Sequence, residues 1–203
     1  MPTLYDYPFS GNGYKVRLVL RELGIAYEYR ALDILKGHTR EPWFLAKNPA
    51  GQIPVLELDD GACLSESSAI LVHVARGTPL FPSDPLSQTR ALQWMCFEQS
   101  NIDGVISRAR FRRAFPDAIP TRPEEFAAWL SEGHRALAVL EGHLSQREFL
   151  VDDAFSIADI ALYAYVHCAD QGGFSLDTYP ALRRWLQRVR SRPAHIAIDD
   201  VAG

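Results

Sequence analysis

Two short polar segments combine residue types that can hold charged groups. The first, Ser10-Gly11-Asn12-Gly13, lies between a strand-like run and a helix-like run. Ser10 offers a hydroxyl donor and Asn12 an amide donor, and the start of a helix adds backbone N–H groups and the positive end of the helix dipole. Together these groups favour an anion. The alternative is that the segment is only a turn and a helix cap, for which serine is well suited.

The second segment is Glu66-Ser67, which begins a helix-like run directly after a strand-like run. A helix N-terminus suits a carboxylate, and the Ser67 hydroxyl can add a hydrogen bond. Glu66 is anionic and can take an ammonium. The adjacent pair therefore matches a ligand group that carries both charges. Ser67 or Ser65 could instead merely cap the helix, although capping and binding are compatible.

The elements that position these segments alternate between strand and helix in the first third of the chain. Strands are predicted at 3–7, 26–31, 55–58 and 62–65, and helices at 13–23, 41–48 and 67–75. Strands joined through a helix pair in parallel, whereas the hairpin signal Asp59-Asp60-Gly61 adds an antiparallel edge. The order β-α-β-α-β-β-α thus predicts a small mixed sheet with helices packed on it.

Residues 77–85 break this pattern with a glycine and three prolines, so they are predicted to form a linker. The chain after the linker has apolar residues at helical spacing, with short breaks between the periodic runs. Such a pattern is typical of a helix bundle. The fold class is therefore α/β plus all-α, with a first domain at 1–76, a linker at 77–85 and a helical domain at 86–203.

One motif in the helical domain is assigned to structure rather than chemistry. Ser156-Ile157-Ala158-Asp159 opens a predicted helix, with serine as N-cap and aspartate three positions later. This is the spacing of a capping box, in which the carboxylate reaches back to the N-cap amide. A carboxylate occupied in that way is not expected to be catalytic.

Composition bounds the function classes. A net charge of −4 gives no electrostatic case for nucleic acid or an anionic membrane, and no apolar run approaches the ~20 residues that span a bilayer. The N-terminus lacks the pattern of a signal peptide, so a cytoplasmic location is expected. Cys63, Cys96 and Cys168 are widely spaced, so we expect neither disulfides nor a zinc site, but three buried small residues.

Three segments carry a resemblance to a known family. They are residues 52–56, 66–70 and 156–159, with the sequences QIPVL, ESSAI and SIAD. Their order and separation are more specific than any one of them alone. Over essentially its full length the chain resembles the soluble, cytosolic glutathione S-transferases. The resemblance implies a thioredoxin-like first domain, glutathione as co-substrate, a helical domain that forms the electrophile pocket and dimer contacts, and a homodimer.

The resemblance also implies how glutathione binds. The Ile53-Pro54 bond is expected to be cis, so that the backbone at Ile53, after Gln52, pairs with the cysteinyl unit like a short added strand. The γ-glutamyl group carries both charges that Glu66 and Ser67 match. An ordinary turn proline at position 54 is the alternative.

A loop after the second predicted strand carries His38, with Lys36 nearby. In some related classes this region reaches the glycine carboxylate of glutathione. A lone histidine in a loop is otherwise usually exposed to solvent without a role. Both interpretations stay open, and His38 is the stronger candidate of the two.

The reactive centre is expected at Ser10 and Asn12. Glutathione must react as a thiolate, although a free thiol has a pKa of about 8.5. This segment resembles a bacterial group in which a hydroxyl residue and an asparagine two positions later share the stabilisation of the thiolate. Position 10 is not cysteine, which argues against the glutaredoxin-like members. Tyr7 ranks third, because Tyr5 and Tyr7 are predicted on one strand face and could be core or wall residues.

A pocket for the electrophile is expected from a long helix of the second domain. Its candidate residues stand at helical spacing, mixing aromatics with cations, and Phe9 could complete the wall. They are Arg108, Phe111, Arg112 and Phe115. A solvated basic face is the alternative. Asp103, on the same helix, could reach the partner subunit's glutathione.

The first hypothesis is therefore an enzyme that conjugates the glutathione thiolate to a small hydrophobic or polarised electrophile, with neither nucleic acid nor membrane as partner. The second is a glutathione-dependent disulfide or peroxide reductase on the same scaffold. The third is a non-catalytic glutathione-binding protein.

Overall fold

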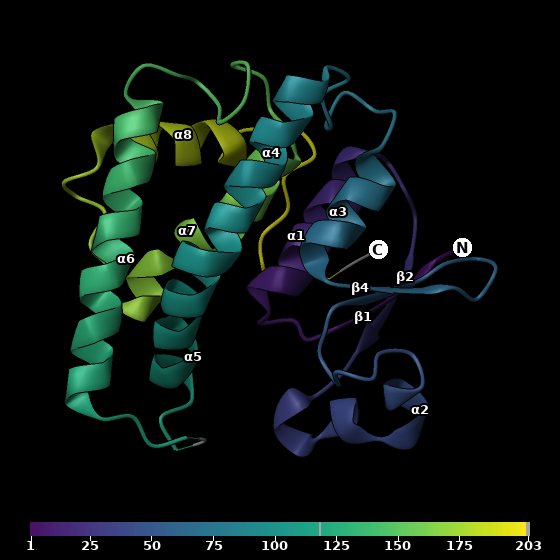
Figure 1. The fold of residues 1–203 in the computed structure, drawn as a ribbon. Coiled ribbons are helices and arrows are strands. Elements are labelled where there is room, and N and C mark those ends of the chain that lie inside the picture. The colour runs from purple at the N-terminus through teal and green to yellow at the C-terminus, as the bar shows by residue number, and fades with distance from the viewer. Residues whose placement is uncertain (118, 202–203) are drawn as a thin grey trace. The chain divides into compact units, whose positions relative to one another are not determined.

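The computed structural model describes residues 1–117 and 119–201, and their contacts divide the chain into two compact units (Figure 1). One unit combines Met1–Thr78 with the chain from Pro193 onward, and the other is Pro79–Arg192. The helical domain was predicted to extend to the end of the chain. The segment after Pro193 belongs instead with the first unit, because side chains of its first helix hold that segment, as described below.

The first unit contains a four-stranded sheet in the order β2-β1-β3-β4. β1 pairs in parallel with β2, while the β1–β3 and β3–β4 pairs are antiparallel. This is the predicted mixed sheet with an antiparallel hairpin at one edge. The strands are β1 (Thr3–Asp6), β2 (Glu28–Ala31), β3 (Val55–Glu57) and β4 (Cys63–Ser65).

Helices cover both faces of this sheet. Figure 1 shows α1 (Gly11–Glu22) and α3 (Ser67–Ala75) on one side and α2 (Pro42–Leu45) on the other. The face under α1 and α3 buries apolar side chains from sheet and helices alike, including Leu4, Leu56, Val16, Val19, Ile70 and Leu71. Two short 3₁₀ turns, η1 (Ile34–Lys36) and η2 (His38–Arg40), precede α2. The thioredoxin-like arrangement therefore places the starts of α1 and α3 directly after strands.

The second unit is all helical. α4 (Pro85–Phe97), the π-helical stretch η3 (Glu98–Ser107) and α5 (Arg108–Ala114) follow one another without a break, where one long helix was predicted. The remaining elements are α6 (Pro123–Leu144), α7 (Ile157–Val166), the 3₁₀ turn η4 (Ala169–Gly172) and α8 (Pro180–Arg190). Every residue of α7 is buried, and this helix packs against α4, η3 and α8. It is the centre of the unit's core.

The N-terminus of α7 is the predicted capping box. The Ser156 amide donates to Asp159 Oδ2 at 3.0 Å, and Ser156 Oγ accepts from the Ala158 amide at 3.3 Å. Asp159 Oδ1 also accepts from the Leu150 amide at 3.1 Å and from Trp185 Nε1 at 2.9 Å. Burial raises the pKa of Asp159 to about 6, with these donors acting in the opposite direction. The motif is structural, as predicted.

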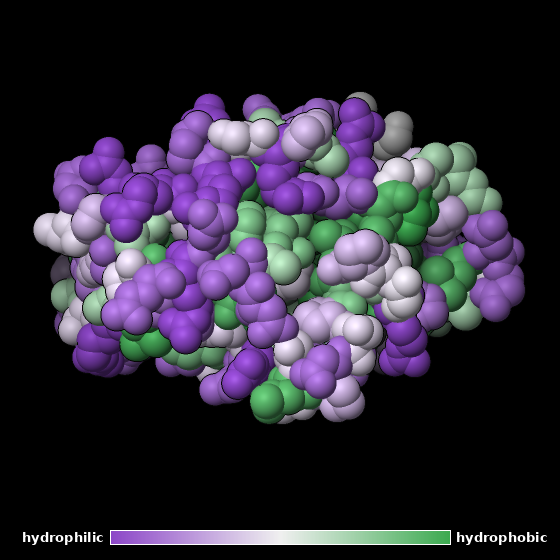
Figure 2. Space-filling model, turned by 90° about the horizontal axis from the view of Figure 1, so that it is seen from above, coloured by the Kyte–Doolittle hydropathy of each residue, from purple (hydrophilic) through white to green (hydrophobic). Residues whose placement is uncertain are grey.

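Polar residues predominate on the surface in the view of Figure 2, where hydrophilic purple covers most of the face and hydrophobic green is confined to smaller areas. Within the described ranges, no helix combines the length and apolar character needed to cross a bilayer. Cys168 is buried and Cys63 partly buried, but Cys96 is exposed. The prediction of three buried cysteines is therefore wrong at Cys96, because this residue lies on the outward side of α4.

Candidate functional site

The turn between β1 and α1 is built around Ser10. Its amide donates to the Tyr7 carbonyl at 2.8 Å, and its Oγ accepts from the Gly13 amide at 3.1 Å. Ser10 is thus the N-cap of α1, which starts two residues earlier than predicted. Capping uses a lone pair of Oγ, and a serine hydroxyl keeps its hydrogen for donation. The two interpretations of this segment, cap and anion donor, are compatible at Ser10.

Asn12 connects the two polar segments found in the sequence. Its Oδ1 accepts a hydrogen bond from Ser67 Oγ at 3.2 Å and another from Lys15 Nζ at 2.7 Å. Ser67 is the first residue of α3 and lies 55 positions further along the chain. The N-termini of α1 and α3 therefore meet, so the predicted thiolate donors and the predicted γ-glutamyl site are neighbours.

The start of α3 has an unusual backbone. Glu66 is the N-cap and has φ +66°, a conformation that non-glycine residues seldom adopt and that is often found at functional sites. Its exposed side chain makes no capping hydrogen bond to α3. Neither Ser65 nor Ser67 is the N-cap, so the purely capping alternative for these serines is wrong. The first turn of α3 and the Glu66 carboxylate can both face a ligand.

The loop before β3 presents a short stretch of backbone. The Ile53-Pro54 peptide bond is cis, as predicted, and Asn48 Nδ2 holds the loop by donating to the Gln52 carbonyl at 2.8 Å. The Ile53 backbone makes no hydrogen bond to another residue within the described part of the chain. Gln52 is exposed, while Pro54 is buried beside β3. An extended peptide can pair with such an edge.

The two tyrosines near β1 have separate environments. Tyr5, on the strand, donates to Glu57 Oε2 at 2.8 Å and packs edge-on against Phe44 of α2. Tyr7 lies beyond the end of β1, so the prediction that both tyrosines belong to the strand is wrong at Tyr7: its carbonyl accepts the turn hydrogen bond instead. Burial, and then the nearby charge of Asp33, raise the pKa of Tyr7, which keeps it a neutral donor.

His38 is held by its own loop. Its Nδ1 accepts from the Asp33 amide at 3.1 Å, which assigns the ring N–H to Nε2. Lys36 pairs with the Asp33 carboxylate at 3.3 Å on the surface. The described contacts do not bring either residue to Ser10, Asn12 or Ser67. Their role toward glutathione stays a prediction.

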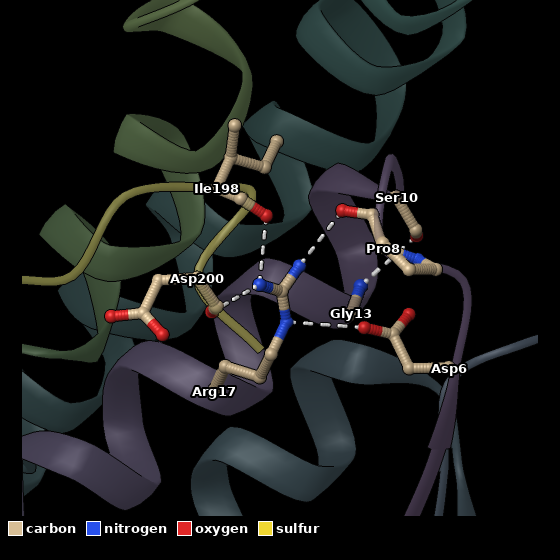
Figure 3. A network of polar contacts seen from close by, with 7 residues as sticks. All are labelled: Asp6, Pro8, Ser10, Gly13, Arg17, Ile198 and Asp200. Carbon is tan, nitrogen blue, oxygen red and sulfur yellow. Dashed lines mark hydrogen bonds and ion pairs between the residues drawn. The ribbon is translucent and has the colours of Figure 1, made fainter. Parts of the chain in front are cut away.

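A buried network that sequence reasoning missed supports the Ser10 turn (Figure 3). Arg17, fully buried on α1, donates Nε to Asp6 Oδ2 at 3.2 Å and one terminal nitrogen to the Pro8 carbonyl at 3.2 Å. Its other terminal nitrogen donates to the carbonyls of Ile198 at 2.8 Å and Asp200 at 2.9 Å. Arg17 therefore ties the turn to β1 and to the segment after Pro193.

The Asp6 and Arg17 side chains of this network are buried, and the Asp6 carboxylate packs closely against Gly13. Burial raises the pKa of Asp6 to about 7, against the lowering effect of Arg17. A Cβ added at Gly13 would overlap the Asp6 carboxylate, so only glycine fits there. The sequence gives little indication of this network. Arg17 stands within an apolar run of α1, where a charged residue looks like an ordinary exposed position.

The predicted pocket residues of the second unit lie in and just after α5. The rings of Phe111 and Phe115 are 5.0 Å apart and partly buried, while Arg108 is exposed. Arg112 donates to the Ile119 carbonyl at 3.4 Å. Phe9 belongs to the first unit, so the pocket that it was predicted to share with these residues stays a prediction.

Two further residues of the second unit are Asp103, a predicted site residue, and Arg110, a buried cation. Asp103 lies in η3, and its predicted contact with a partner subunit stays a prediction. Arg110, which sequence reasoning did not select, is buried and donates Nε to Gln171 Oε1 at 2.6 Å.

Two family models cover most of the chain. Residues 4–79 match the model described as "Glutathione S-transferase, N-terminal domain", and residues 104–193 match "Glutathione S-transferase, C-terminal domain". The two models match in the order of the two structural units. The residues between the two matches, 80–103, run from before α4 into η3.

Similar proteins include solved structures and a curated relative. A glutathione S-transferase from Pseudomonas fluorescens gives a TM-score of 0.95 at 48% identity over 98% of this chain and 99% of that one. The glutathione transferase URE2P6 from Phanerochaete chrysosporium, solved with oxidized glutathione, gives 0.86 at 30% identity over 95% and 92%. Disulfide-bond oxidoreductase YfcG of Escherichia coli (strain K12) is 34% identical over 96% of this chain and 92% of its own length. By sequence and by fold, this chain belongs to the glutathione S-transferase family.

Proposed function

We propose that the chain binds glutathione in its first unit, holds the sulfur as a thiolate and adds it to a small electrophile. The observation that carries this proposal is the hydrogen bond between Asn12 and Ser67 at 3.2 Å. This bond joins the start of α1, which has hydroxyl and amide donors, to the start of α3, which suits the carboxylate and the ammonium of an amino acid. Glutathione has a thiol and a γ-glutamyl group within one short molecule.

The γ-glutamyl group would bind at the start of α3. Its carboxylate meets the N–H groups of the first turn and the positive end of the helix dipole. Its ammonium meets the exposed carboxylate of Glu66, whose positive φ turns the chain at this point. Ser67 lies between this site and Asn12.

The cysteinyl unit would pair with the backbone of Ile53, which makes no hydrogen bond to a described residue. This antiparallel pairing would carry the sulfur from the α3 site toward the start of α1. Gln52 and Pro54 flank the pairing position. At the other end of the tripeptide, the glycine carboxylate is assigned to His38, with Lys36 as the weaker candidate.

The thiolate would be held by Ser10 and Asn12 at the start of α1. A hydroxyl hydrogen, an amide N–H and the helix dipole each stabilise the anion relative to the thiol, so the pKa of bound glutathione falls below its value in water. Tyr7 is the third candidate donor, because its raised pKa keeps the phenol protonated. The catalytic contribution is then thiolate formation and orientation.

The electrophile is assigned to four residues of the second unit, Arg108, Phe111, Arg112 and Phe115, with Phe9 of the first unit as a further candidate. Aromatic rings suit a hydrophobic body and guanidinium groups suit a polarised or anionic one. We place the active protein in the cytoplasm as a homodimer, with Asp103 directed to the partner's glutathione.

Calorimetry and thiolate absorbance test the proposal together. Wild-type protein should bind glutathione and show the ultraviolet band of its thiolate at a pH where free glutathione is a thiol. Ser10→Ala and Asn12→Ala should both reduce this band, and Ser10→Ala should reduce it more. Matched surface variants, Ser145→Ala and Asn101→Ala, should leave it unchanged. Absence of binding by folded protein at millimolar glutathione would refute the proposed function.

Reductase activity is the second candidate, favoured by the 34% identity to a disulfide-bond oxidoreductase. The same thiolate would attack a disulfide instead of an electrophilic carbon, which releases one thiolate of the substrate and forms a mixed disulfide with glutathione. A second glutathione would then attack this mixed disulfide to give oxidised glutathione and release the other thiolate, so no cysteine of this chain would be required. Product analysis separates the two reactions: a thioether from a chlorinated aromatic, or oxidised glutathione from a disulfide. Retention on immobilised glutathione without either product would favour a non-catalytic binding protein.

A further inference from the structure

We propose that Lys15 is a positioning residue for the thiolate: its ammonium fixes the Asn12 amide so that the amide N–H groups face the glutathione sulfur. This inference rests on the proposed function. It concerns a residue that lies one helical turn after Asn12, on the buried side of α1.

The first step is the burial and geometry of Lys15. Its side chain is fully buried, and its Nζ lies 2.7 Å from Asn12 Oδ1, a short charge-assisted hydrogen bond. Burying an ammonium costs free energy unless hydrogen bonds offset that cost. The Asn12 oxygen supplies one such bond at a position three residues earlier on the same helix.

The second step is the direction of the amide. An ammonium can only donate, whereas a carboxamide has an accepting end and a donating end. Only the orientation with Oδ1 toward Lys15 gives an attraction, and the flipped amide would bring N–H groups against a cation. Lys15 therefore selects one of the two orientations of Asn12.

Ser67 is compatible with this orientation, because a serine hydroxyl can donate as well as accept. Its hydroxyl donates to Asn12 Oδ1 at 3.2 Å, so two donors from two helices converge on one oxygen. The Nδ2 group of Asn12 is thereby directed away from both Lys15 and Ser67. In the proposed complex it faces the side from which glutathione enters.

The third step is the effect on the sulfur. An amide whose oxygen accepts from a cation is polarised, so its N–H groups become stronger donors. The buried charge of Lys15 also favours an anion close by, because screening by water is weak there. Both effects lower the pKa of the bound thiol, while the α3 and Ile53 contacts that determine tripeptide affinity do not involve Lys15.

The test compares Lys15→Met with Lys15→Arg, in the full chain saturated with glutathione. Lys15→Met keeps the length and burial of the side chain but cannot donate. We expect its bound glutathione to titrate about one pKa unit higher, which is about a tenfold loss of thiolate below that pKa. The conjugation rate should fall about equally at low pH and recover at high pH. The dissociation constant, measured below the pKa of the thiol bound to wild-type protein, should change less than about twofold. Lys15→Arg, which only donates, should restore most of the shift.

A double-mutant comparison isolates the route through Asn12. If Lys15 acts mainly by orienting the amide, Lys15→Met should add little to the pKa of bound thiol in an Asn12→Ala background. Lys47→Met is the matched control: Lys47 pairs with Glu57 at 2.7 Å elsewhere in the unit and should leave the thiol pKa unchanged. Should Lys15→Met fail to fold, Lys15→Gln replaces it, because a glutamine amide can present either end and should give a smaller rise.

The outcomes distinguish this inference from the proposed function. Wild-type protein that holds a thiolate, with a Lys15→Met variant of unchanged thiol pKa, would overturn the role of Lys15 and leave the function standing. Full additivity of Lys15→Met and Asn12→Ala would overturn the orienting role as well. Failure of wild-type protein to hold a thiolate would remove the function and this inference with it.

Discussion

The N-termini of α1 and α7 use the same cap for opposite purposes. Ser156 caps α7 and is followed three residues later by Asp159, whose carboxylate accepts from three different residues. Ser10 caps α1, but the first turn of α1 contains no acidic residue. The equivalent region holds Asn12 and the ammonium of Lys15 instead. At α7 the anion belongs to the protein, whereas at α1 the local field is suited to an anion from outside.

Burial separates the two sites in the same way. Ser156 and Asp159 are buried, whereas Ser10 and Asn12 are partly exposed. A serine at a helix start is therefore ambiguous by itself. The neighbouring charge and the access of solvent decide whether its hydroxyl serves the fold or a ligand.

Gly13→Ala should have the largest effect on the α1 side. The added methyl group overlaps the Asp6 carboxylate and would push it away from Arg17, so we expect destabilisation of about 3 kcal/mol or more. Gly142→Ala in α6 is the matched control, because nothing lies within 4 Å of its added Cβ. Alanine there should stabilise the helix by about 0.5–1 kcal/mol. Urea unfolding of both variants measures the difference, and equal midpoints would contradict the overlap.

Asp159→Ala should have the largest effect on the α7 side. It leaves the buried Trp185 indole and two backbone amides without their acceptor, which should cost about 3 kcal/mol. The control is Asp177→Ala, at an exposed position where the carboxylate accepts from Ser175. In the folded fraction of Asp159→Ala, the thiol pKa of bound glutathione should be that of the wild type. A changed thiol pKa would show that α7 is not purely structural.

The buried carboxyl of Asp159 also predicts a pH dependence. Its pKa is raised to about 6 in the folded chain, above an unfolded value of 3.8, so the folded state binds the proton more tightly. The stabilisation that the protonated Asp159 carboxyl contributes is therefore fully present below about pH 4. It is lost as pH rises through about 6, and the total loss is about 3 kcal/mol. Asp6, with a pKa raised to about 7, acts in the same direction.

Unfolding free energies measured from pH 4 to pH 7 test the predicted pH dependence of stability. Asp159→Asn cannot titrate, so its stability should fall less steeply with pH than that of the wild type. Parallel slopes for the two proteins would contradict the assignment to Asp159.

The two cap serines give the smallest and most diagnostic effect. Ser10→Ala and Ser156→Ala should each lose about 1 kcal/mol of stability, because each helix loses its N-cap. Only Ser10→Ala should also raise the thiol pKa of bound glutathione. Denaturation and thiolate titration of the same two samples separate the roles. A shift of the thiol pKa in Ser156→Ala, or none in Ser10→Ala, would break the comparison.

Local signals in the sequence predicted the cap of α7 and the order of the elements, and they left a cap at Ser10 as an alternative. The capping box of α7 has its own spacing, and α1 and α3 each follow a strand directly. Arg17 and Lys15 were missed because both resemble ordinary charged positions of an amphipathic helix. Arg17 acts over a long distance in the chain, on the carbonyls of Ile198 and Asp200. Lys15 acts locally, on the oxygen of Asn12 three residues earlier.

The segment after Pro193 was assigned to the wrong part for the same reason. Its described residues, up to 201, contain no helix, strand or hydrophobic period. Their place is set by hydrogen bonds that the Tyr14 and Arg17 side chains donate to the backbone carbonyls of Ile196 and Ile198. Every residue has a backbone carbonyl, so the residue types do not show which carbonyl a side chain will bind. The π-helical stretch was missed because its apolar spacing is close to that of an ordinary helix.

A thiolate titration of wild-type protein saturated with glutathione tests the central claim most directly. If the start of α1 holds an anion from outside, the bound thiol should titrate at least about one pKa unit below the value of about 8.5 for a free thiol. A bound thiol with the same pKa as the thiol of free glutathione would contradict the claim that α1 stabilises the thiolate, however tightly the tripeptide binds.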